Sequence, residues 1–303
     1  MLSYVIKRVL MAVATIFIIV AITFFSMNAI PGGPFDSEKA PTPEVKAVLN
    51  ERYNLDKPLI QQFGIYINNV LHGDFGVSLK TGRSVSTIIN ESFSTSATLG
   101  IRAIIAALAF GLVLGCIAAA FKNTIIDRGI MFLSTFFVSI PNFVVASILI
   151  LVFCLRLHWF PVWSAEQTSY FLPVVSLMLY PMSCIIRYTR TGTLDALSQN
   201  YIRTARAKGL SGFKIIFKHA LRNAAIPVMT YIGPMTAYVL TGSVVVETVF
   251  TIGGLGSQFI NGIVNRDYSL IMGTTIFMAF IIVITTLISD ILYKVIDPRI
   301  KFE

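Results

Sequence analysis

The sequence predicts an all-α, polytopic membrane protein with six transmembrane helices. Of its 303 residues, 55% are apolar and only 13% are charged, whereas a soluble domain carries about 25% charged residues. The mean hydropathy is +0.76. A span needs about 20 apolar residues, and six stretches meet that length: 9–30, 95–121, 129–154, 171–191, 226–248 and 271–293.

The first apolar stretch is predicted to be a retained span. Lys7 and Arg8 precede it, as they would in a signal peptide. The apolar run from Val9 to Ile30 is too long for a signal-peptide core, and no Ala-x-Ala cleavage site follows it.

The basic residues predict that both termini lie in the cytoplasm. With the N-terminus inside, the inner segments are 1–8, 122–128, 187–222 and 294–303, which hold 15 of the 24 Lys and Arg. Cytoplasmic loops carry this excess of positive charge. Arg187 and Arg190 are expected to snorkel from the fourth span to the same interface.

The longest outer segment, 31–94, is predicted to contain short amphipathic helices. The stretch after the first span is rich in turn residues, and helical spacing begins at Pro43–Arg52. A second helix is predicted over Pro58–Leu71, with one apolar face formed by Leu59, Phe63, Tyr66, Ile67 and Val70. His72–Gly76 is predicted to be a turn.

Several residues inside the spans are expected to shape the helix packing. Proline removes a backbone hydrogen bond and can bend a helix, and the spans contain Pro141, Pro173, Pro181, Pro227 and Pro234. Gly111 and Gly115 form a small-xxx-small ridge suited to close helix contact. Polar side chains such as Asn142 and Tyr238 indicate either hydrogen bonds between helices or a weakly polar pathway.

Tyr201–Pro227, between the fourth and fifth spans, is amphipathic and basic. Gly209 stands at a helix-stop position and is predicted to divide the segment into two short helices. Ala205, Gly209 and Gly212 would leave a low surface on which another protein could approach closely. An ordinary positively charged loop is the alternative interpretation of the same charge pattern.

The motifs needed for catalysis or cofactor binding are missing. No phosphate-binding Gly-x4-Gly-Lys-Ser/Thr motif is present, so the chain is not expected to hydrolyse ATP. The three histidines and three cysteines show no metal-ligand spacing. The net charge of +9 lies in short segments beside apolar runs, which favours a membrane protein over a nucleic-acid partner. No enzyme activity, cofactor or metal is expected.

The basic segment resembles the cytoplasmic coupling loop of ABC-transporter permeases. The matching residues are Arg203-Thr204-Ala205, Gly209-Leu210 and His219-Ala220-Leu221. Arg203, Thr204, His219 and Arg222 depart from the general form, in which Glu, Ala, Ile and Pro stand there. These departures are typical of the dipeptide/oligopeptide branch.

Other segments are similar to the same branch. They are Ile30–Pro34, Asn54–Pro58, His72–Ser78, Val246–Phe250, Gly253–Gly256 and Asn265–Ser269. The family usually has Pro where Gly253 stands. The resemblance therefore covers residues 1 to about 300.

The resemblance implies a type I ABC importer permease fold in a bacterial inner membrane. The implied parts are residues 1–30 as the N-terminal end and first span, and 31–94 as a periplasmic segment. Residues 95–293 would form the permease core, with the coupling loop at 192–224, and 294–303 a cytoplasmic tail. The implied partners are a second homologous permease, two cytoplasmic ATPase subunits, a periplasmic peptide-binding protein, a peptide substrate and membrane lipid.

The resemblance also implies how these parts work. The Tyr201–Ser211 helix would dock on one ATPase, with Ala205 and Gly209 closest to it, and its movement would rock the fourth and fifth spans. The expected contacts of the binding protein are Asp74, Glu247, Arg266 and Asp267. Oligopeptides are the expected cargo. Dipeptides or nickel are alternatives, and a stand-alone secondary transporter is a more distant one.

Overall fold

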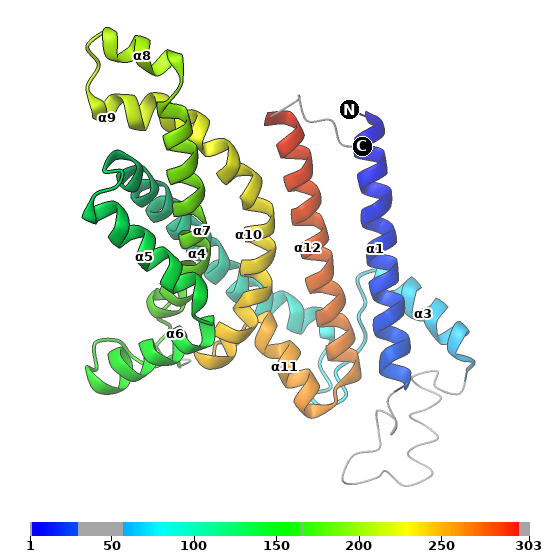
Figure 1. The fold of residues 1–303 in the computed structure, drawn as a ribbon. Helices are drawn as coiled ribbons and strands as arrows, with labels where there is room; N and C mark the ends of the chain where they lie inside the picture. The colour runs from blue at the N-terminus through cyan, green and yellow to red at the C-terminus, as the bar shows by residue number, and fades with distance from the viewer. Residues whose placement is uncertain (1, 30–56, 165–166, 297–303) are drawn as a thin grey trace. The chain divides into compact units, whose positions relative to one another are not determined.

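The computed structural model describes residues 2–29, 57–164 and 167–296, and every regular element in these ranges is helical (Figure 1). The α-helices are α1 (Leu2–Ala29), α3 (Leu59–Leu71), α4 (Val85–Ala120), α5 (Ile125–Ser139), α6 (Asn142–Leu149), α7 (Phe171–Leu197), α8 (Asn200–Ala207), α9 (Gly212–Lys214), α10 (Leu221–Val249), α11 (Leu255–Asn265) and α12 (Tyr268–Ile296). Two π-helices, η1 (Ile150–Arg156) and η2 (Ile215–Ala220), continue α6 and α9. The predicted helix at Pro43–Arg52 and the motif at Ile30–Pro34 lie outside the described residues.

Five described segments are long and apolar enough to cross a membrane. They are Val5–Ala29, Val85–Ala120, Phe171–Leu197, Gly212–Val249 and Tyr268–Ile291. Each contains most or all of a predicted span. Val85–Ala120 and Gly212–Val249, which contain the second and fifth predicted spans, extend well beyond the apolar stretches, to 36 and 38 residues.

The third predicted span is broken rather than continuous. α5 and the α6–η1 pair are bent by 102° to each other. Pro141 causes the break, because the residue before a proline is forced into an extended conformation and Ile140 has ψ 128°. Counted as one crossing, the pair brings the described spans to the six that the sequence predicts.

The other predicted prolines lie either in a helix interior or in the first turn of a helix. Pro181, Pro227 and Pro234 lie inside α7 and α10, as predicted. Pro173 is the third residue of α7. In the first helical turn the N–H has no intrahelical acceptor to lose, so a proline there is tolerated. The expectation that Pro173 bends its helix is therefore wrong.

The chain divides into two compact units. One contains residues 97–252 and 285–303, and the other contains residues 1–96 and 253–284. In the first unit, α7 packs against α5, α6 and α10. Its apolar core includes Leu99, Leu177, Ile185, Met235 and Val239.

Glycines bring α4 very close to α7 within the first unit. A Cβ on Gly111 would lie 2.6 Å from Ile185 Cγ2, and one on Gly115 would lie 2.5 Å from Thr189 Cβ. Real Cβ atoms do not approach other heavy atoms this closely. The predicted role of the small-residue ridge in helix packing is confirmed.

In the second unit, α3 packs on α1 through aromatic side chains. The ring centroids of Phe24 lie 5.3 Å from Phe63 and 5.6 Å from Tyr66. Four residues of the predicted apolar face, Phe63, Tyr66, Ile67 and Val70, are half-buried. Leu59 is 47% exposed and does not take part in this packing.

Candidate functional site

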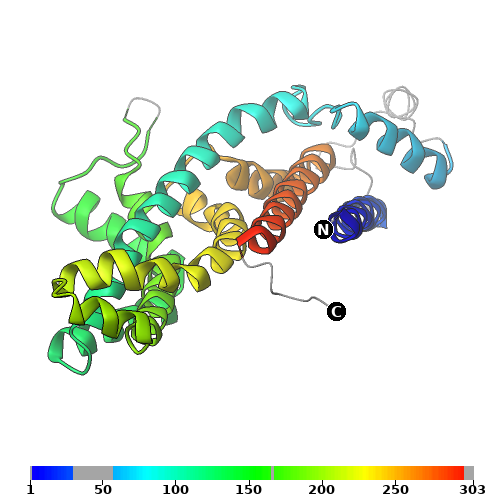
Figure 2. The same cartoon turned by 90° about the horizontal axis from the view of Figure 1, so that it is seen from above.

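The basic loop, residues Tyr201–Pro227, lies at one end of α7 and α10 (Figure 1). Figure 2, which looks down on this end, shows the loop in yellow-green over the green helices of the same unit. The predicted division at Gly209 is confirmed, because α8 ends at Ala207 and Gly209 has φ +73°. Glycine adopts this left-handed backbone readily. The second half differs from the prediction, since α9, η2 and α10 follow one another without a gap.

The apolar face of the loop forms a small core of its own. Ile202 and Ala205 are buried together with Ile215 and Ala220 of the same loop and Ala196 of α7, and Leu210 packs against them. The side chain of Asn223 donates a hydrogen bond of 2.8 Å to the Tyr201 hydroxyl, which ties α8 to α10. The two halves of the loop are therefore held to each other and to the span helices.

The predicted coupling-loop residues differ in how far they are exposed. Arg203, Thr204 and Gly209 are exposed, whereas Leu210, His219 and Leu221 are half-buried. Ala205 is only 7% exposed. It faces the core of the loop, so the expectation that Ala205 lies at the closest contact with a partner is not supported by its position.

An aromatic pair on the loop, with one ring exposed and the other half-buried, was missed at the sequence level. Phe213 is 73% exposed, and its ring centroid lies 4.5 Å from that of Phe217. Exposed basic residues surround this pair along the loop: Arg203, Arg206, Lys208, Lys214, Lys218 and Arg222. Phe213 and Phe217 are four residues apart, a spacing that puts two side chains on one helical face and could have identified the pair from the sequence.

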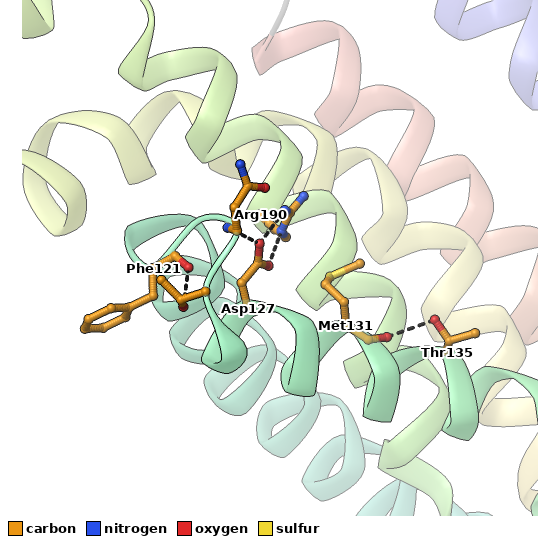
Figure 3. A network of polar contacts seen from close by, with 7 residues as sticks. Phe121, Asp127, Met131, Thr135 and Arg190 are labelled. Carbon is orange, nitrogen blue, oxygen red and sulfur yellow. Dashed lines mark hydrogen bonds and ion pairs between the residues drawn. The ribbon is translucent and has the colours of Figure 1, made fainter.

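A buried ion pair holds α5 to α7 near the same end. The Arg190 Nε and Nη2 atoms donate to the two Asp127 carboxylate oxygens at 2.6 and 2.7 Å (Figure 3). The Asn123 N–H donates to the same carboxylate at 2.8 Å. The Arg190 guanidinium is therefore satisfied by a carboxylate near the start of α5, and its predicted snorkelling to the interface stays a prediction.

Arg187 and Asn142 also form hydrogen bonds between helices. The Arg187 guanidinium donates to the Thr135 hydroxyl at 2.8 Å, so it too bonds within the protein. Asn142 at the start of α6 donates to the Tyr238 hydroxyl of α10 at 2.7 Å. Of the two roles left open for Asn142 and Tyr238, this contact supports bonding between helices.

The candidate contacts of a binding protein have different exposures. Asp74 and Arg266 are exposed. The Asp74 carboxylate accepts the Gly76 N–H at 2.9 Å within the predicted turn at His72–Gly76. Arg266 ends α11 in a left-handed conformation, with φ +53°. Both side chains are placed where another protein could reach them.

Asp267 and Glu247 are buried instead. The Asp267 carboxylate accepts hydrogen bonds from the Ser78 hydroxyl at 2.5 Å and the Leu79 N–H at 3.2 Å, and it also caps α12. Asp267 is 1% exposed and Glu247 is fully buried. The expected contact of these two side chains with a binding protein is not supported, because their carboxylates lie inside the chain.

Two family profiles together match nearly the whole chain. The N-terminal profile of binding-protein-dependent transport system membrane components matches residues 1–100, and the profile of the inner membrane component itself matches residues 111–302. The chain is 44% identical to the dipeptide transport system permease protein DppB of Bacillus subtilis, over 100% of this chain and 99% of the relative. It is 42% identical to the oligopeptide transport system permease protein OppB of Haemophilus influenzae and 41% identical to that of Escherichia coli, with full coverage of both chains.

A solved structure shares the fold. The inward-facing MetNI methionine ABC transporter aligns with a TM-score of 0.56 at 14% sequence identity, over 69% of this chain and 96% of that chain. This similarity supports the predicted ABC importer permease fold. On the profiles and the full-length relatives, the chain belongs to the family of inner membrane components of binding-protein-dependent transport systems.

Proposed function

We propose that this permease forms part of an ATP-driven importer that carries peptides across the inner membrane. The observation that carries the proposal is the full-length similarity to DppB and OppB, whose names give dipeptide and oligopeptide transport. A second homologous permease would complete the pathway. Two ATPase subunits would bind on the side of the basic loop, and a peptide-loaded binding protein on the opposite side.

The geometry of the basic loop supports its role as the coupling element. Its core joins α8 and η2 to α7, so a force on the loop would move α7 and α10 as a block rather than deform the loop. The exposed Phe213 ring, with the half-buried Phe217 beside it, and the basic residues around this pair would meet the ATPase. An aromatic anchor with a charged rim is the usual composition of a tight protein interface.

Gly209 allows a test that separates bulk from backbone strain. Any side chain at φ +73° costs about 1–2 kcal/mol, although a Cβ there would meet nothing within 4 Å. Gly209→Ala and Gly209→Trp carry the same backbone cost, and only tryptophan adds bulk. We expect ATP-dependent peptide uptake in reconstituted vesicles to fall much further in Gly209→Trp than in Gly209→Ala. Equal uptake by both variants would show that Gly209 is not part of the docking surface.

Phe213 provides a second test of the same surface. An interface aromatic that acts as a hot spot contributes about 2 kcal/mol, or about 30-fold in affinity. Phe213→Ala should weaken ATPase binding by that factor while leaving membrane insertion intact. Phe121, which is 48% exposed between α4 and α5, provides a matched control variant, Phe121→Ala. If both variants bind the ATPase as the parent does, the Phe213–Phe217 pair is not the anchor.

Orientation is tested by labelling from one side of the membrane. A cysteine at Lys208 should react with an impermeant reagent only from the cytoplasm. Photo-cross-linkers at Asp74 and Arg266 should capture the binding protein from the opposite side. Labelling of Lys208→Cys from the outside would invert the proposed topology.

The choice of cargo and energy source is tested by reconstitution with the partner subunits. Uptake of labelled dipeptides and pentapeptides should require ATP and the binding protein. Competition between the two peptides would establish the preferred length. Uptake driven by an ion gradient without the ATPase subunits would favour a secondary transporter instead.

A further inference from the structure

In the first unit, one face of the spanning helices is polar. Between Phe171 and Asp195 of α7, the exposed residues are Tyr188 and Thr191. By contrast, the exposed residues of α4 after Arg102 are all apolar: Ile105, Ala109, Phe110, Val113 and Ala120. Lipid chains offer no hydrogen bonds, so the α4 face suits the bilayer and the α7 face suits a polar neighbour.

Four tyrosines extend this polar face across α7 and α10, which pack side by side. We call Tyr180 and Tyr188 of α7 with Tyr231 and Tyr238 of α10 the tyrosine row. The ring centroids of Tyr180 and Tyr238 lie 4.7 Å apart, and those of Tyr188 and Tyr231 lie 5.3 Å apart. Along α7 the two pairs are eight residues apart, which corresponds to about 12 Å. The row therefore presents two pairs of rings at two levels of the helices.

Hydrogen bonds from neighbouring helices position the surroundings of the row. Asn142 donates to the Tyr238 hydroxyl at 2.7 Å. Next to Tyr188 in the chain, the Arg187 guanidinium donates to the Thr135 hydroxyl of α5 at 2.8 Å. Tyr188 nevertheless remains 43% exposed. The rings are thus fixed by the packing of α7 and α10, while the inner pair stays accessible through Tyr188.

Prolines on the same face of α10 leave a backbone acceptor beside the row. Pro227 and Pro234 are exposed and alternate with Tyr231 and Tyr238 at intervals of three or four residues, which is one helical face. Proline has no N–H, so the carbonyl of Thr230, four residues before Pro234, lacks its usual helical donor. Thr230 is itself exposed. Inside a membrane, such an acceptor favours a ligand that brings its own N–H groups.

A peptide backbone has the chemistry that this face can bind. Each residue other than proline has one N–H donor and one C=O acceptor, and a tyrosine hydroxyl can both donate and accept. The rings add flat apolar contact for side chains of differing shape. An extended chain rises about 3.3 Å per residue, so the distance between the two ring pairs is the length of about four residues.

We propose that the tyrosine row binds the backbone of a peptide in transit. The hydroxyls of Tyr180, Tyr188 and Tyr231 exchange hydrogen bonds with the peptide, and the Thr230 carbonyl accepts one of its N–H groups. An extended chain of about four residues reaches both ring pairs. Because these contacts use groups that all peptides share, the row accepts varied side chains. The inference rests on the peptide cargo proposed above.

Photo-cross-linking in the assembled transporter tests whether a peptide reaches the row. Benzoylphenylalanine would replace Tyr188 in one variant. In the control variant it would replace Ile105, which is 62% exposed on the apolar face of α4. During ATP-driven uptake into vesicles, a radiolabelled tetrapeptide should be captured at position 188 and not at position 105.

The other outcomes of this experiment separate the inference from the proposed function. Capture at Tyr188 of lipid or of the second permease alone, or equal capture of peptide at both positions, overturns the inference. Peptide uptake by the parent without capture at Tyr188 also refutes the inference alone. A parent transporter that takes up no peptide refutes the proposed cargo, and the inference with it.

Peptide length provides a second test that keeps every ring in place. Tyr180→Phe removes one hydroxyl and leaves the ring against Tyr238. Binding would be measured without the binding protein, by competition against a photoreactive tetrapeptide that labels the permease directly. A neutral hydrogen bond contributes about fivefold in binding, so the concentration of tetra-alanine that halves labelling should rise by that factor. The concentration of dialanine should not change, because a chain of about 7 Å reaches only one ring pair.

A tyrosine outside the row provides the matched control. Tyr66→Phe removes a hydroxyl from α3 and should change neither concentration. The inference is overturned if Tyr180→Phe binds tetra-alanine as the parent does, or if the rise is the same for both peptides. Matching melting temperatures verify that each variant is folded.

Discussion

Breaking the Asp127–Arg190 pair is expected to destabilise the permease far more than a surface ion pair would. The two side chains are 4% and 22% exposed, and the carboxylate also accepts the Asn123 N–H. Removing one member leaves the other charge buried without its partner, which costs about 3–5 kcal/mol. At the lower end of that range, the ratio of folded to unfolded protein falls more than 100-fold.

A double-mutant cycle with shape-preserving substitutions measures this contribution. Asp127→Asn keeps an oxygen for the Asn123 N–H and removes the charge, and Arg190→Met keeps the aliphatic stem. Because the double variant contains neither charge, it should lose less than the sum of the two single variants. Unfolding in mixed detergent micelles gives the free energy of each variant.

A second arginine–carboxylate pair in the chain provides the control. Arg83 and Glu91 are 51% and 59% exposed, and their closest atoms are 2.7 Å apart. Exposed pairs contribute about 0–1 kcal/mol, so the same cycle at Arg83 and Glu91 should show little coupling. If the two cycles gave equal coupling energies, burial would not be the reason for the strength of the Asp127–Arg190 contact.

Substitutions at Gly115, Asp267 and Tyr66 test the packing of other elements. Gly115→Val should cost at least 1–3 kcal/mol, because a Cβ there would lie 2.5 Å from Thr189 Cβ, whereas Gly129→Ala, with nothing within 4 Å, should leave the melting temperature unchanged or higher. Asp267→Asn weakens the hydrogen bonds that the carboxylate accepts from the turn before α4 and should increase proteolysis of that turn; unchanged digestion would contradict this. Burial raises the pKa of Tyr66, and its hydroxyl has no hydrogen-bond partner among the described residues. Unfolded tyrosine ionises near pH 10, so stability should fall as the pH rises above that value in the parent and less in Tyr66→Phe, as melting curves would show.

The break in the third span shows the limit of reading helices from composition. Pro141 could be identified from the sequence as a helix modifier. A proline inside a helix can cause either a modest bend or a sharp change of direction, and the sequence does not distinguish the two. The contacts available to the helix after Pro141 decided between a modest bend and a sharp change of direction. Asn142 bonds to α10, and Ala146 packs into the core, so α6 lies across its neighbours instead of continuing α5.

The sequence alone determined the class of protein, the approximate positions of the spans and the family, because these depend on hydrophobic run length, charge placement and local motifs. Gly209, Gly111 and Gly115 were also identifiable, since the absence of a Cβ has a local consequence. The direction in which Ala205, Asp267, Glu247 and Arg190 point was decided only by the tertiary structure. A short or charged side chain at a helix surface can face a partner protein, the lipid or its own core, and only the residues packed beside it distinguish these outcomes.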